Sequence, residues 1–161
     1  MNFIDTVVDF DQTEVAEIRI DPITSNRALF SKKKFVKGEV IITFLAKSVQ
    51  STPTYLTVQI SDDVHIELLP ECLECTNHSC DPNCFFDTTN MQFVTLEAIA
   101  EGEEFTFFYP SAEWDMDQPF QCRCESNDCL GLIQGAKYLS PKSIRKYRFT
   151  DFIKQKLGSI G

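Results

Sequence analysis

The chain has 161 residues, of which 43% are hydrophobic and 24% are charged, and this balance predicts one globular domain rather than a disordered chain. No apolar run approaches the ~20 residues that cross a membrane, so we expect no membrane contact. The acidic N-terminal residues lack the basic start and apolar stretch of a signal peptide, which predicts a reducing compartment, where seven cysteines argue against a disulfide framework.

The charge is divided unevenly along the chain. Residues 1–136 hold 8 Lys and Arg against 23 Asp and Glu, whereas residues 137–161 hold 7 basic residues and one acid, Asp151. An acidic body repels nucleic acid and attracts basic partners such as lysine-rich peptides, although charge alone is equally consistent with a role in solubility. We therefore expect no direct nucleic-acid binding by the body. The basic segment could contact nucleic acid or lie against the acidic body, and we favour the second interpretation.

Alternating apolar and polar residues, separated by turn residues, predict a strand-rich chain. The expected strands are residues 15–20, 39–46, 55–60, 64–69, 91–100 and 103–109. Asp62 and Asp63 are expected to turn the chain between the third and fourth of these as a hairpin, and Gly102 lies between the last two.

Helical signal is scarce before the C-terminal segment, where a helix is predicted over residues 140–157. Ser140 is a capping residue and Pro141 suits the first turn. The residues expected to form the apolar face of this helix are Ile144, Tyr147, Phe152 and Ile153.

The stretch CTNHSCDPNC, residues 75–84, packs three cysteines and a histidine into ten positions, and Pro82 keeps it from being a helix. A metal site, a cysteine nucleophile and a disulfide knot are three interpretations of it. A nucleophile needs a base, and the sequence offers only His65 and His78. The two-residue spacing of His78 and Cys80 does not by itself aim their side chains at each other, which disfavours the nucleophile.

A second cysteine cluster, CRCESNDC at residues 122–129, has the spacing C-x-C-x4-C. Three thiolates this close can face one soft cation, and a structural zinc site needs four tetrahedral ligands. Cys80 is the candidate for the fourth ligand, because its irregular stretch can bring the thiolate alongside. Three ordinary reduced thiols near a turn are the alternative.

Cys72 and Cys75 form a C-x2-C pair, which together with Cys80 and Cys84 permits a second metal site. We expect this pair instead to be buried as small apolar groups in a short helical turn. The zinc hypothesis therefore depends on Cys80 and the cluster at residues 122–129.

Four motifs in one order resemble those of the SET-domain lysine methyltransferases that carry a post-SET zinc segment. TNHSCDPNC resembles the signature N-H-S-C-x-P-N, GEEFTFFY resembles G-E-E-L-T-F-D-Y, and FQCRCESNDCLG resembles the post-SET C-x-C-x4-C. NRALFSKKKFVKGEVI, residues 26–41, lines up with the family's G-x-G-L-F-A…G-E-V-I segment. The resemblance covers most of residues 20–131.

This resemblance implies a mainly β fold of the α+β class, the SET-domain β-clip of small sheets with a threaded, pseudoknot-like loop. A zinc-stapled post-SET segment and a terminal helix complete the implied fold. The implied divisions are a lead-in at residues 1–14, the SET domain at 15–118, the post-SET segment at 119–135 and a basic C-terminal helix at 136–161.

The resemblance also implies binding sites for S-adenosylmethionine and Zn²⁺. The donor-binding residues would be Arg27, Ala28, Leu29, Asn77, His78, Tyr109, Phe120 and Leu130. Residues 27–29 and His78 would act mainly through their backbone, and Phe120 and Leu130 would cover the adenine, with ordinary packing as the alternative for both. The zinc ligands would be Cys80, Cys122, Cys124 and Cys129. The metal would then staple the C-terminal segment over the cofactor pocket.

Two residues match positions that carry the family's chemistry. Tyr109 matches the catalytic tyrosine, whose hydroxyl would orient the amine and the donor methyl, and Phe107 matches a phenylalanine/tyrosine switch. Phenylalanine there leaves room for more than one methylation. A lysine amine has a pKa of ~10.4 in water, and an apolar channel favours its neutral, nucleophilic form. No acidic residue is required for this chemistry.

The chain departs from the family pattern at three places. Phe108 replaces the usual aspartate, which we expect to affect packing rather than chemistry. Asn26 and Ala28 stand where glycines are usual; asparagine tolerates positive φ and alanine adds only a methyl, so donor binding is expected to survive in weakened form. Residues 42–76 are all that separates GEVI from Asn77, so the insert that builds one wall of the substrate groove is short.

Three functions are compatible with these residues. The first is a protein-lysine methyltransferase for a histone tail or another basic protein, which implies a nuclear location, with the cytoplasm as the alternative. The second is a methyltransferase for a small amine or a non-histone protein, which the short groove favours. The third is a catalytically silent, zinc-stapled binding module, which the missing glycines favour. The oligomeric state is left open.

Overall fold

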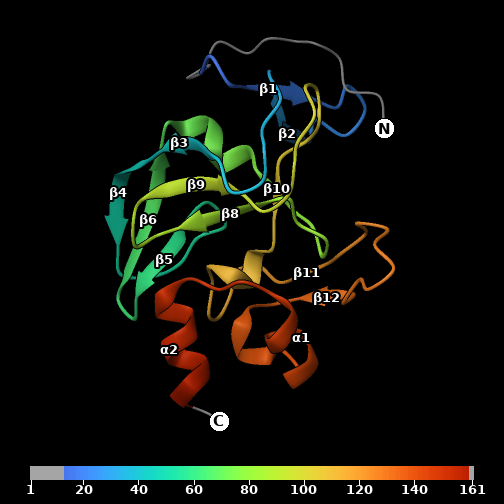
Figure 1. Cartoon of the computed structure of the whole chain (residues 1–161). Coiled ribbons are helices and arrows are strands. Elements are labelled where there is room, and N and C mark those ends of the chain that lie inside the picture. Colours follow the sequence, from blue (N-terminus) through green and yellow to red (C-terminus); the bar gives the residue numbers. More distant parts are fainter. Residues whose placement is uncertain (1–12, 160–161) are drawn as a thin grey trace.

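A computed structural model describes residues 13–159 of the chain. The predicted lead-in at residues 1–14 therefore lies outside the described residues, apart from Thr13 and Glu14. Short strands and a few short helices make up residues 13–159 (Figure 1). Within this range no helix has the length and apolar character needed to cross the hydrocarbon core of a membrane.

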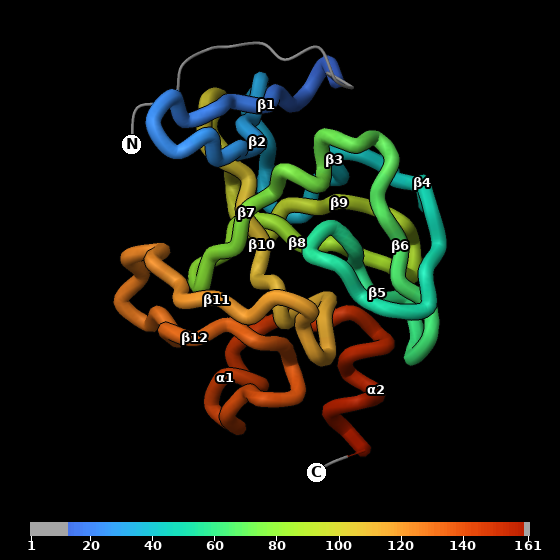
Figure 2. Tube along the Cα trace, turned by 180° about the vertical axis from the view of Figure 1, so that it is seen from behind, coloured from blue at the N-terminus to red at the C-terminus, as the bar shows by residue number. Residues whose placement is uncertain are grey.

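The strands of residues 13–159 form four small sheets. The strands are β1 Ala16–Ile20, β2 Arg27–Ser31, β3 Val40–Thr43, β4 Leu45–Gln50, β5 Val58–Ser61, β6 Val64–Leu69, β7 Asn77–His78, β8 Cys84–Asp87, β9 Gln92–Thr95, β10 Thr106–Phe107, β11 Phe120–Gln121 and β12 Leu132–Ile133. The sheets have the strand orders β1-β2, β3-β9-β8-β10-β7, β11-β12 and β4-β6-β5. The α-helices are α1 Pro141–Lys146 and α2 Asp151–Ser159. The β1-β2 ribbon and the two helices lie at opposite ends of the molecule (Figure 2).

Two of the strand predictions are confirmed. The strand expected at residues 15–20 is β1, and the hairpin expected around Asp62 and Asp63 is the antiparallel pair β5-β6. The first strand of that hairpin begins at Val58 rather than at Tyr55.

The single strand predicted at residues 39–46 is wrong, because the chain bends at Phe44 and forms two strands in different sheets. β3 pairs with β9, and β4 pairs with β6. The Phe44 ring is fully buried and packs edge-on against Phe86, with ring centroids 5.7 Å apart. The Phe44 ring is therefore part of the core that both sheets share. One continuous strand could not place it there while pairing with both β9 and β6.

β10 threads between two strands that precede it in the chain. β7 and β8 are separated by residues 79–83 only, yet β10 lies between them and pairs in parallel with both. The predicted strands at 91–100 and 103–109 are correspondingly shorter, since β9 ends at Thr95 and β10 contains only Thr106 and Phe107. This threading brings the stretch at residues 75–84 directly beside residues 104–109.

Two helices stand where one was predicted over residues 140–157. Ser140 caps α1 as expected, since its hydroxyl accepts a hydrogen bond from the Ser143 N–H at 3.2 Å. Tyr147 then leaves the helix with extended backbone. Thr150 starts α2, because its Oγ1 accepts from the Ile153 N–H at 3.3 Å. Thr150 followed by Asp151 is a helix-start signal that was readable in the sequence.

The basic C-terminal segment lies against the acidic body, as expected. Three of its lysines form ion pairs with acids of the preceding segment: Lys137 with Asp115 at 3.2 Å, Lys146 with Asp128 at 3.1 Å and Lys156 with Asp62 at 2.8 Å. Exposed pairs of this kind each contribute about 0–1 kcal/mol. The three ion pairs therefore orient the C-terminal segment, and they contribute little to the free energy that keeps it against the body.

Phe108 anchors the C-terminal helices to the body. Its ring is buried and stacks on Tyr147, with centroids 3.7 Å apart and planes 10° apart, and it meets Phe149 edge-on. With Ala136 and Ile153 these residues form a separate buried cluster. The expectation that Phe108 acts through packing is confirmed.

Removing the Phe108 ring is expected to destabilise the protein substantially. Phe108→Ala should lower the free energy of unfolding by about 3–5 kcal/mol, because the stack on Tyr147 is replaced by a cavity. Urea denaturation measures this. As a control, Tyr147→Phe keeps the stack and loses only one hydrogen bond, at a cost of about 1 kcal/mol. Equal stability of the Phe108→Ala variant and the wild type would show that the cluster is not an anchor.

Candidate functional site

Asn77 joins the two segments that meet at the threaded strand. Its Nδ2 donates to the Arg27 carbonyl oxygen at 2.9 Å and to the Glu104 carboxylate at 3.2 Å. The Phe105 N–H donates to the carbonyl oxygen of Leu29 at 2.8 Å. These bonds bring the predicted donor-binding residues at the start of β2 beside the predicted donor-binding residues of β7.

The side chains at the start of β2 differ in exposure. Arg27 is exposed, whereas Ala28 and Leu29 are fully buried, backbone included, so neither of these two residues presents an exposed surface to a ligand in this structure. The position with positive φ in this turn is Ser25 (φ 60°), and Asn26 does not adopt that conformation. The methyl of Ala28 is accommodated in the core, so neither departure from glycine distorts the local chain.

The His78 ring is held by protein groups on both sides. Its Nδ1 accepts a hydrogen bond from the Tyr109 N–H at 3.1 Å, and its Nε2 lies 3.3 Å from the Cys80 Sγ. Burial lowers the pKa of His78 to about 4, so the ring is neutral at neutral pH. Because Nδ1 is an acceptor, Nε2 carries the proton and faces the sulfur. The side chains of His78 and Cys80 therefore do meet, which their spacing alone did not reveal.

Tyr109 lies at the wall of an apolar cavity of about 260 Å³. Its hydroxyl donates to the Thr76 carbonyl oxygen at 3.1 Å, and burial raises its pKa, so the hydroxyl stays protonated. Phe107 lines the same cavity and packs against Tyr109 and Phe86, with ring centroids 4.7 Å from each. Two residues predicted from the sequence thus line the same, mainly apolar cavity.

Phe120 and Leu130 occupy different surroundings. Phe120 lines the Tyr109 cavity, with its ring centroid 5.6 Å from that of His78 and 5.8 Å from that of Tyr109. Leu130 lies outside that cavity with 37% of its surface exposed, and its N–H donates to the Cys80 Sγ at 3.4 Å. The structure therefore brings Phe120 to the Tyr109 cavity, whereas Leu130 lies outside it, beside Cys80.

The four cysteines singled out as zinc ligands come together. Their Sγ atoms all lie within 4.8 Å of one another, and those of Cys80 and Cys122 are 4.0 Å apart. A tetrahedral site with Zn–S distances of ~2.3 Å requires sulfur atoms ~3.8 Å apart, so the four thiols are compatible with a zinc site. Burial raises the pKa of Cys122 to about 11, and a divalent cation would offset this by stabilising the thiolates. Cys72 and Cys75 lie outside the cluster, buried in a 3-10 helix at Glu71–Cys75 as expected.

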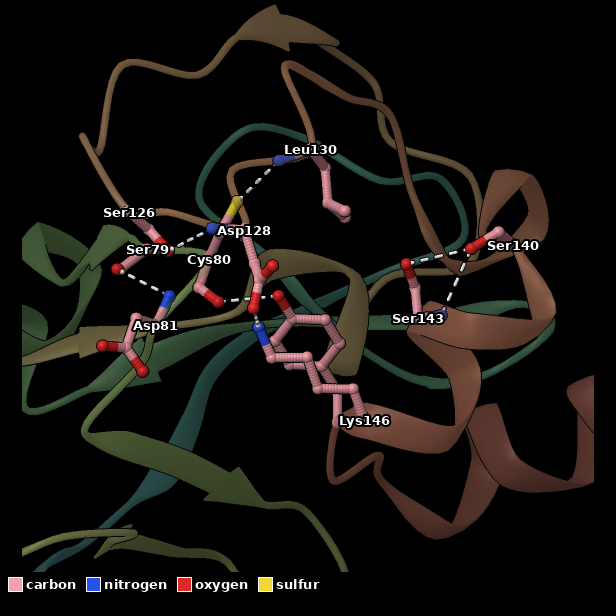
Figure 3. A network of polar contacts seen from close by, with 10 residues as sticks. Ser79, Cys80, Asp81, Ser126, Asp128, Leu130, Ser140, Ser143 and Lys146 are labelled. Carbon is pink, nitrogen blue, oxygen red and sulfur yellow. Dashed lines mark hydrogen bonds and ion pairs between the residues drawn. The ribbon is translucent and has the colours of Figure 1, made fainter.

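The turn that carries Cys80 is also tied to the C-terminal helices. The Tyr147 hydroxyl donates to the Cys80 carbonyl oxygen at 2.6 Å, and Lys146 pairs with Asp128 beside the cluster (Figure 3). Figure 3 also shows Leu130 facing Cys80 across the hydrogen bond to sulfur. Tyr147 was missed as a site residue, because 67 positions separate it from Cys80 and no local pattern links them.

Two carboxyl groups at the cavity were also missed. Glu113 and Glu74 both line the space beside Tyr109, and each has a buried oxygen without a hydrogen-bond partner within residues 13–159. The stretch SAEW around Glu113 contains no pattern that predicts a cavity residue. Glu113 lines the cavity only because segments distant in sequence meet there.

Comparisons with known proteins agree with the geometry. A family model described as SET domain matches residues 26–110. The chain is 41% identical over 106 residues to Methyltransferase flvH of Aspergillus flavus, a match that covers 65% of this chain and 59% of that protein. It is 35% identical over 65 residues to Histone-lysine N-methyltransferase ash1 of Drosophila melanogaster, covering 37% of this chain and 3% of that protein. The chain therefore spans less than two thirds of the length of each of these relatives.

A solved structure shares the fold. The crystal structure of KRYPTONITE in complex with mCHH DNA, H3(1–15) peptide and SAH aligns with a TM-score of 0.54 at 17% sequence identity. The alignment covers 73% of this chain and 29% of that chain. The mainly β architecture is thus one that a solved structure also adopts.

Proposed function

Because this chain belongs to the SET-domain family, whose model matches residues 26–110, we propose that it transfers a methyl group from S-adenosylmethionine to an amine, with lysine in a basic protein as the favoured acceptor. The observation that carries the proposal is the Tyr109 hydroxyl, held by the Thr76 carbonyl oxygen at the wall of an apolar cavity beside Phe107. A fixed hydroxyl beside aromatic rings in an apolar cavity can orient a neutral amine for attack on a methyl group.

The residues of the cavity have separable roles in this proposal. S-adenosylmethionine supplies an electrophilic methyl group on a sulfonium. Phe107 and Phe120 exclude water and disfavour the charged ammonium, which cannot attack. The Tyr109 hydroxyl orients the amine, and alignment converts a bimolecular displacement into an effectively intramolecular one. Asn77, tied to the Arg27 carbonyl oxygen, holds the donor side of the site together.

The zinc segment has a structural role in the proposal. Cys80, Cys122, Cys124 and Cys129 would hold the metal, and the proximity of their Sγ atoms, all within 4.8 Å of one another, supports this assignment. Cys80 lies two residues after His78, whose ring in turn accepts from the Tyr109 backbone. The metal would thereby fix the position of Tyr109 without taking part in the transfer.

The acceptor is proposed to be a lysine of a histone tail or another basic protein. The net charge of −9 favours a basic partner, and a histone substrate would place the protein in the nucleus. A small amine is the second candidate, and the cavity volume favours it. At about 260 Å³ the cavity is smaller than the ~300–1,000 Å³ of typical ligand pockets, so it suits one amine-bearing chain.

A methyl-transfer assay tests the proposal. The protein is incubated with methyl-labelled S-adenosylmethionine and, in separate reactions, with histones, a lysine-peptide array and a panel of small amines. Transfer to histones or peptides supports the favoured acceptor, and transfer to small amines alone supports the second candidate. Calorimetric titration with the donor separates both from a silent binding module: absence of donor binding together with absence of transfer would refute the proposed activity.

The product state depends on Phe107 in this proposal. Phe107 carries no hydroxyl that could hold a methylated amine, so the wild type should add more than one methyl group. Phe107→Tyr should stop the reaction at one methyl group and slow the first transfer by no more than about tenfold, because the new hydroxyl adds roughly one hydrogen bond of about 1 kcal/mol. Mass spectrometry of the acceptor under excess donor measures this. A wild-type product with a single methyl group would show that another residue sets the limit.

A further inference from the structure

Tyr147 joins two segments of the body that are distant from each other in sequence. Its hydroxyl donates to the Cys80 carbonyl oxygen at 2.6 Å, and its ring stacks on Phe108, the residue that follows β10. A ring that served packing alone would leave its hydroxyl to water, whereas this hydroxyl makes a short, directed hydrogen bond. One side chain of the C-terminal segment therefore contacts both the stretch at residues 75–84 and the end of β10.

The stretch at residues 75–84 is also the one that directs Tyr109. The Tyr109 N–H donates to the His78 Nδ1 at 3.1 Å, and the Tyr109 hydroxyl donates to the Thr76 carbonyl oxygen at 3.1 Å. Tyr147 holds the same stretch two residues beyond His78. The place of both acceptors of Tyr109 therefore depends on a segment that Tyr147 fixes.

The C-terminal segment also holds the short turn that carries the proposed catalytic hydroxyl. This turn is a 3-10 helix at Tyr109–Ser111, and the Thr150 N–H donates to the Ser111 carbonyl oxygen at 3.0 Å. Within the turn, the Ser111 N–H donates to the Phe108 carbonyl oxygen at 2.8 Å. The turn is thus supported before its first residue by the stack of Phe108 on Tyr147, and at its last residue by Thr150.

We infer that Tyr147 is a positioning residue for Tyr109, a specific extension that rests on the proposed methyl transfer. The Tyr147 hydroxyl keeps the Cys80 turn in place against the end of β10. Without that bond the turn can shift, and the two hydrogen-bond acceptors of Tyr109 shift with it. Tyr147 lies beyond residues 26–110, which the SET-domain model matches, so this support comes from the C-terminal part of the chain.

The alternative is that Tyr147 only anchors the buried cluster around Phe108. Tyr147→Phe separates the two roles, because it keeps the ring and the stack and removes the bond to Cys80. For a positioning residue kcat should fall about tenfold or more, since a 1 Å misplacement of reacting groups can cost about 100-fold. KM for the acceptor should stay within about twofold, because Tyr147 does not line the cavity.

A double-variant cycle shows whether Tyr147 acts through Tyr109. Adding Tyr147→Phe to Tyr109→Phe should reduce transfer little further, whereas two independent effects would multiply. Zinc content should equal that of the wild type, because the substitution leaves the four Sγ atoms untouched. Tyr138→Phe, which removes the same atom from an exposed tyrosine of the C-terminal segment, should transfer methyl groups as the wild type does.

NMR of the folded protein tests the inference even where no acceptor is methylated, so its failure is distinct from failure of the proposed function. In ¹⁵N-labelled Tyr147→Phe the Tyr109 amide proton should move upfield, because its bond to the His78 Nδ1 lengthens, and the Nδ1 signal should move with it. The chain has two histidines, which makes the ring signals simple to assign. Amide signals of the β5-β6 hairpin should stay in place.

A packing role would lower the stability of the variant and leave the spectrum of its folded site unchanged. Unchanged Tyr109 and His78 signals would therefore overturn the inference. In an active enzyme, a native kcat, losses that multiply in the double variant, or a zinc content below that of the wild type would each overturn it as well.

Discussion

Replacing Tyr109 by phenylalanine is expected to reduce methyl transfer by about 100- to 1,000-fold, the range seen when one well-placed hydrogen-bond donor is removed from an active site. The hydroxyl is buried at the cavity wall and stays protonated, because burial raises its pKa. Its fixed direction comes from the hydrogen bond to the Thr76 carbonyl oxygen. Initial rates with labelled donor measure the loss.

The same substitution should leave the fold in place. Tyr109→Phe removes one hydrogen bond, which costs about 1 kcal/mol, and the ring retains its contacts with Phe107 and Phe120. Tyr138→Phe is the matched control, since it removes the same atom from an exposed tyrosine bonded to Asp115. Nearly native transfer by Tyr109→Phe would show that this tyrosine is a packing residue only.

Loss of one cysteine of the cluster is expected to release zinc and to destabilise the C-terminal half. Structural zinc contributes about 10–16 kcal/mol in zinc-finger peptides, so Cys122→Ser should cost several kcal/mol and lower the thermal midpoint by ten degrees or more, at about 2–4 °C per kcal/mol. Donor affinity should fall as well, because Cys80 and Asn77 belong to the same short segment. Metal analysis, thermal unfolding and calorimetry measure the three effects.

Chelation provides an independent route to the same result. Removal of zinc from the wild type should reproduce the lower midpoint of Cys122→Ser, and chelator should have little further effect on that variant. Cys75→Ser is the control, since Cys75 is buried outside the cluster and its loss should leave one zinc per chain. Protein purified without chelator and found free of zinc would contradict the four-cysteine site.

Elements with local signals were predictable from the sequence. β1, the β5-β6 hairpin and the Ser140 cap each follow from a pattern a few residues long. Three members of the cysteine cluster were predictable because they lie within eight positions. Cys80 was the favoured candidate for the fourth, and the family resemblance completed the set.

Features that depend on contacts distant in sequence were not predictable. The bend at Phe44 follows from burial of its ring between two sheets. The threading of β10 rests on parallel pairing with strands distant in sequence, so no local pattern indicated it, and it was expected only through the family resemblance. The hydrogen bond of Tyr147 to Cys80, and the lack of a hydrogen-bond partner for the Glu113 carboxyl within residues 13–159, both depend on the folded structure, because the residues involved are distant in sequence. The break between α1 and α2 could have been predicted, because Thr150 is a local N-cap signal. It was missed because the apolar residues at residues 140–157 suggested one continuous helix.

Mass spectrometry of an amine acceptor, after incubation with this protein and S-adenosylmethionine whose methyl group carries deuterium, tests the proposed methyl transfer most directly. We expect deuterated methyl groups on lysine nitrogen or on a small amine, more than one per nitrogen with time, and almost none with Tyr109→Phe. Absence of labelled product from histones, peptides and small amines alike, in protein that carries zinc and is folded, would contradict it.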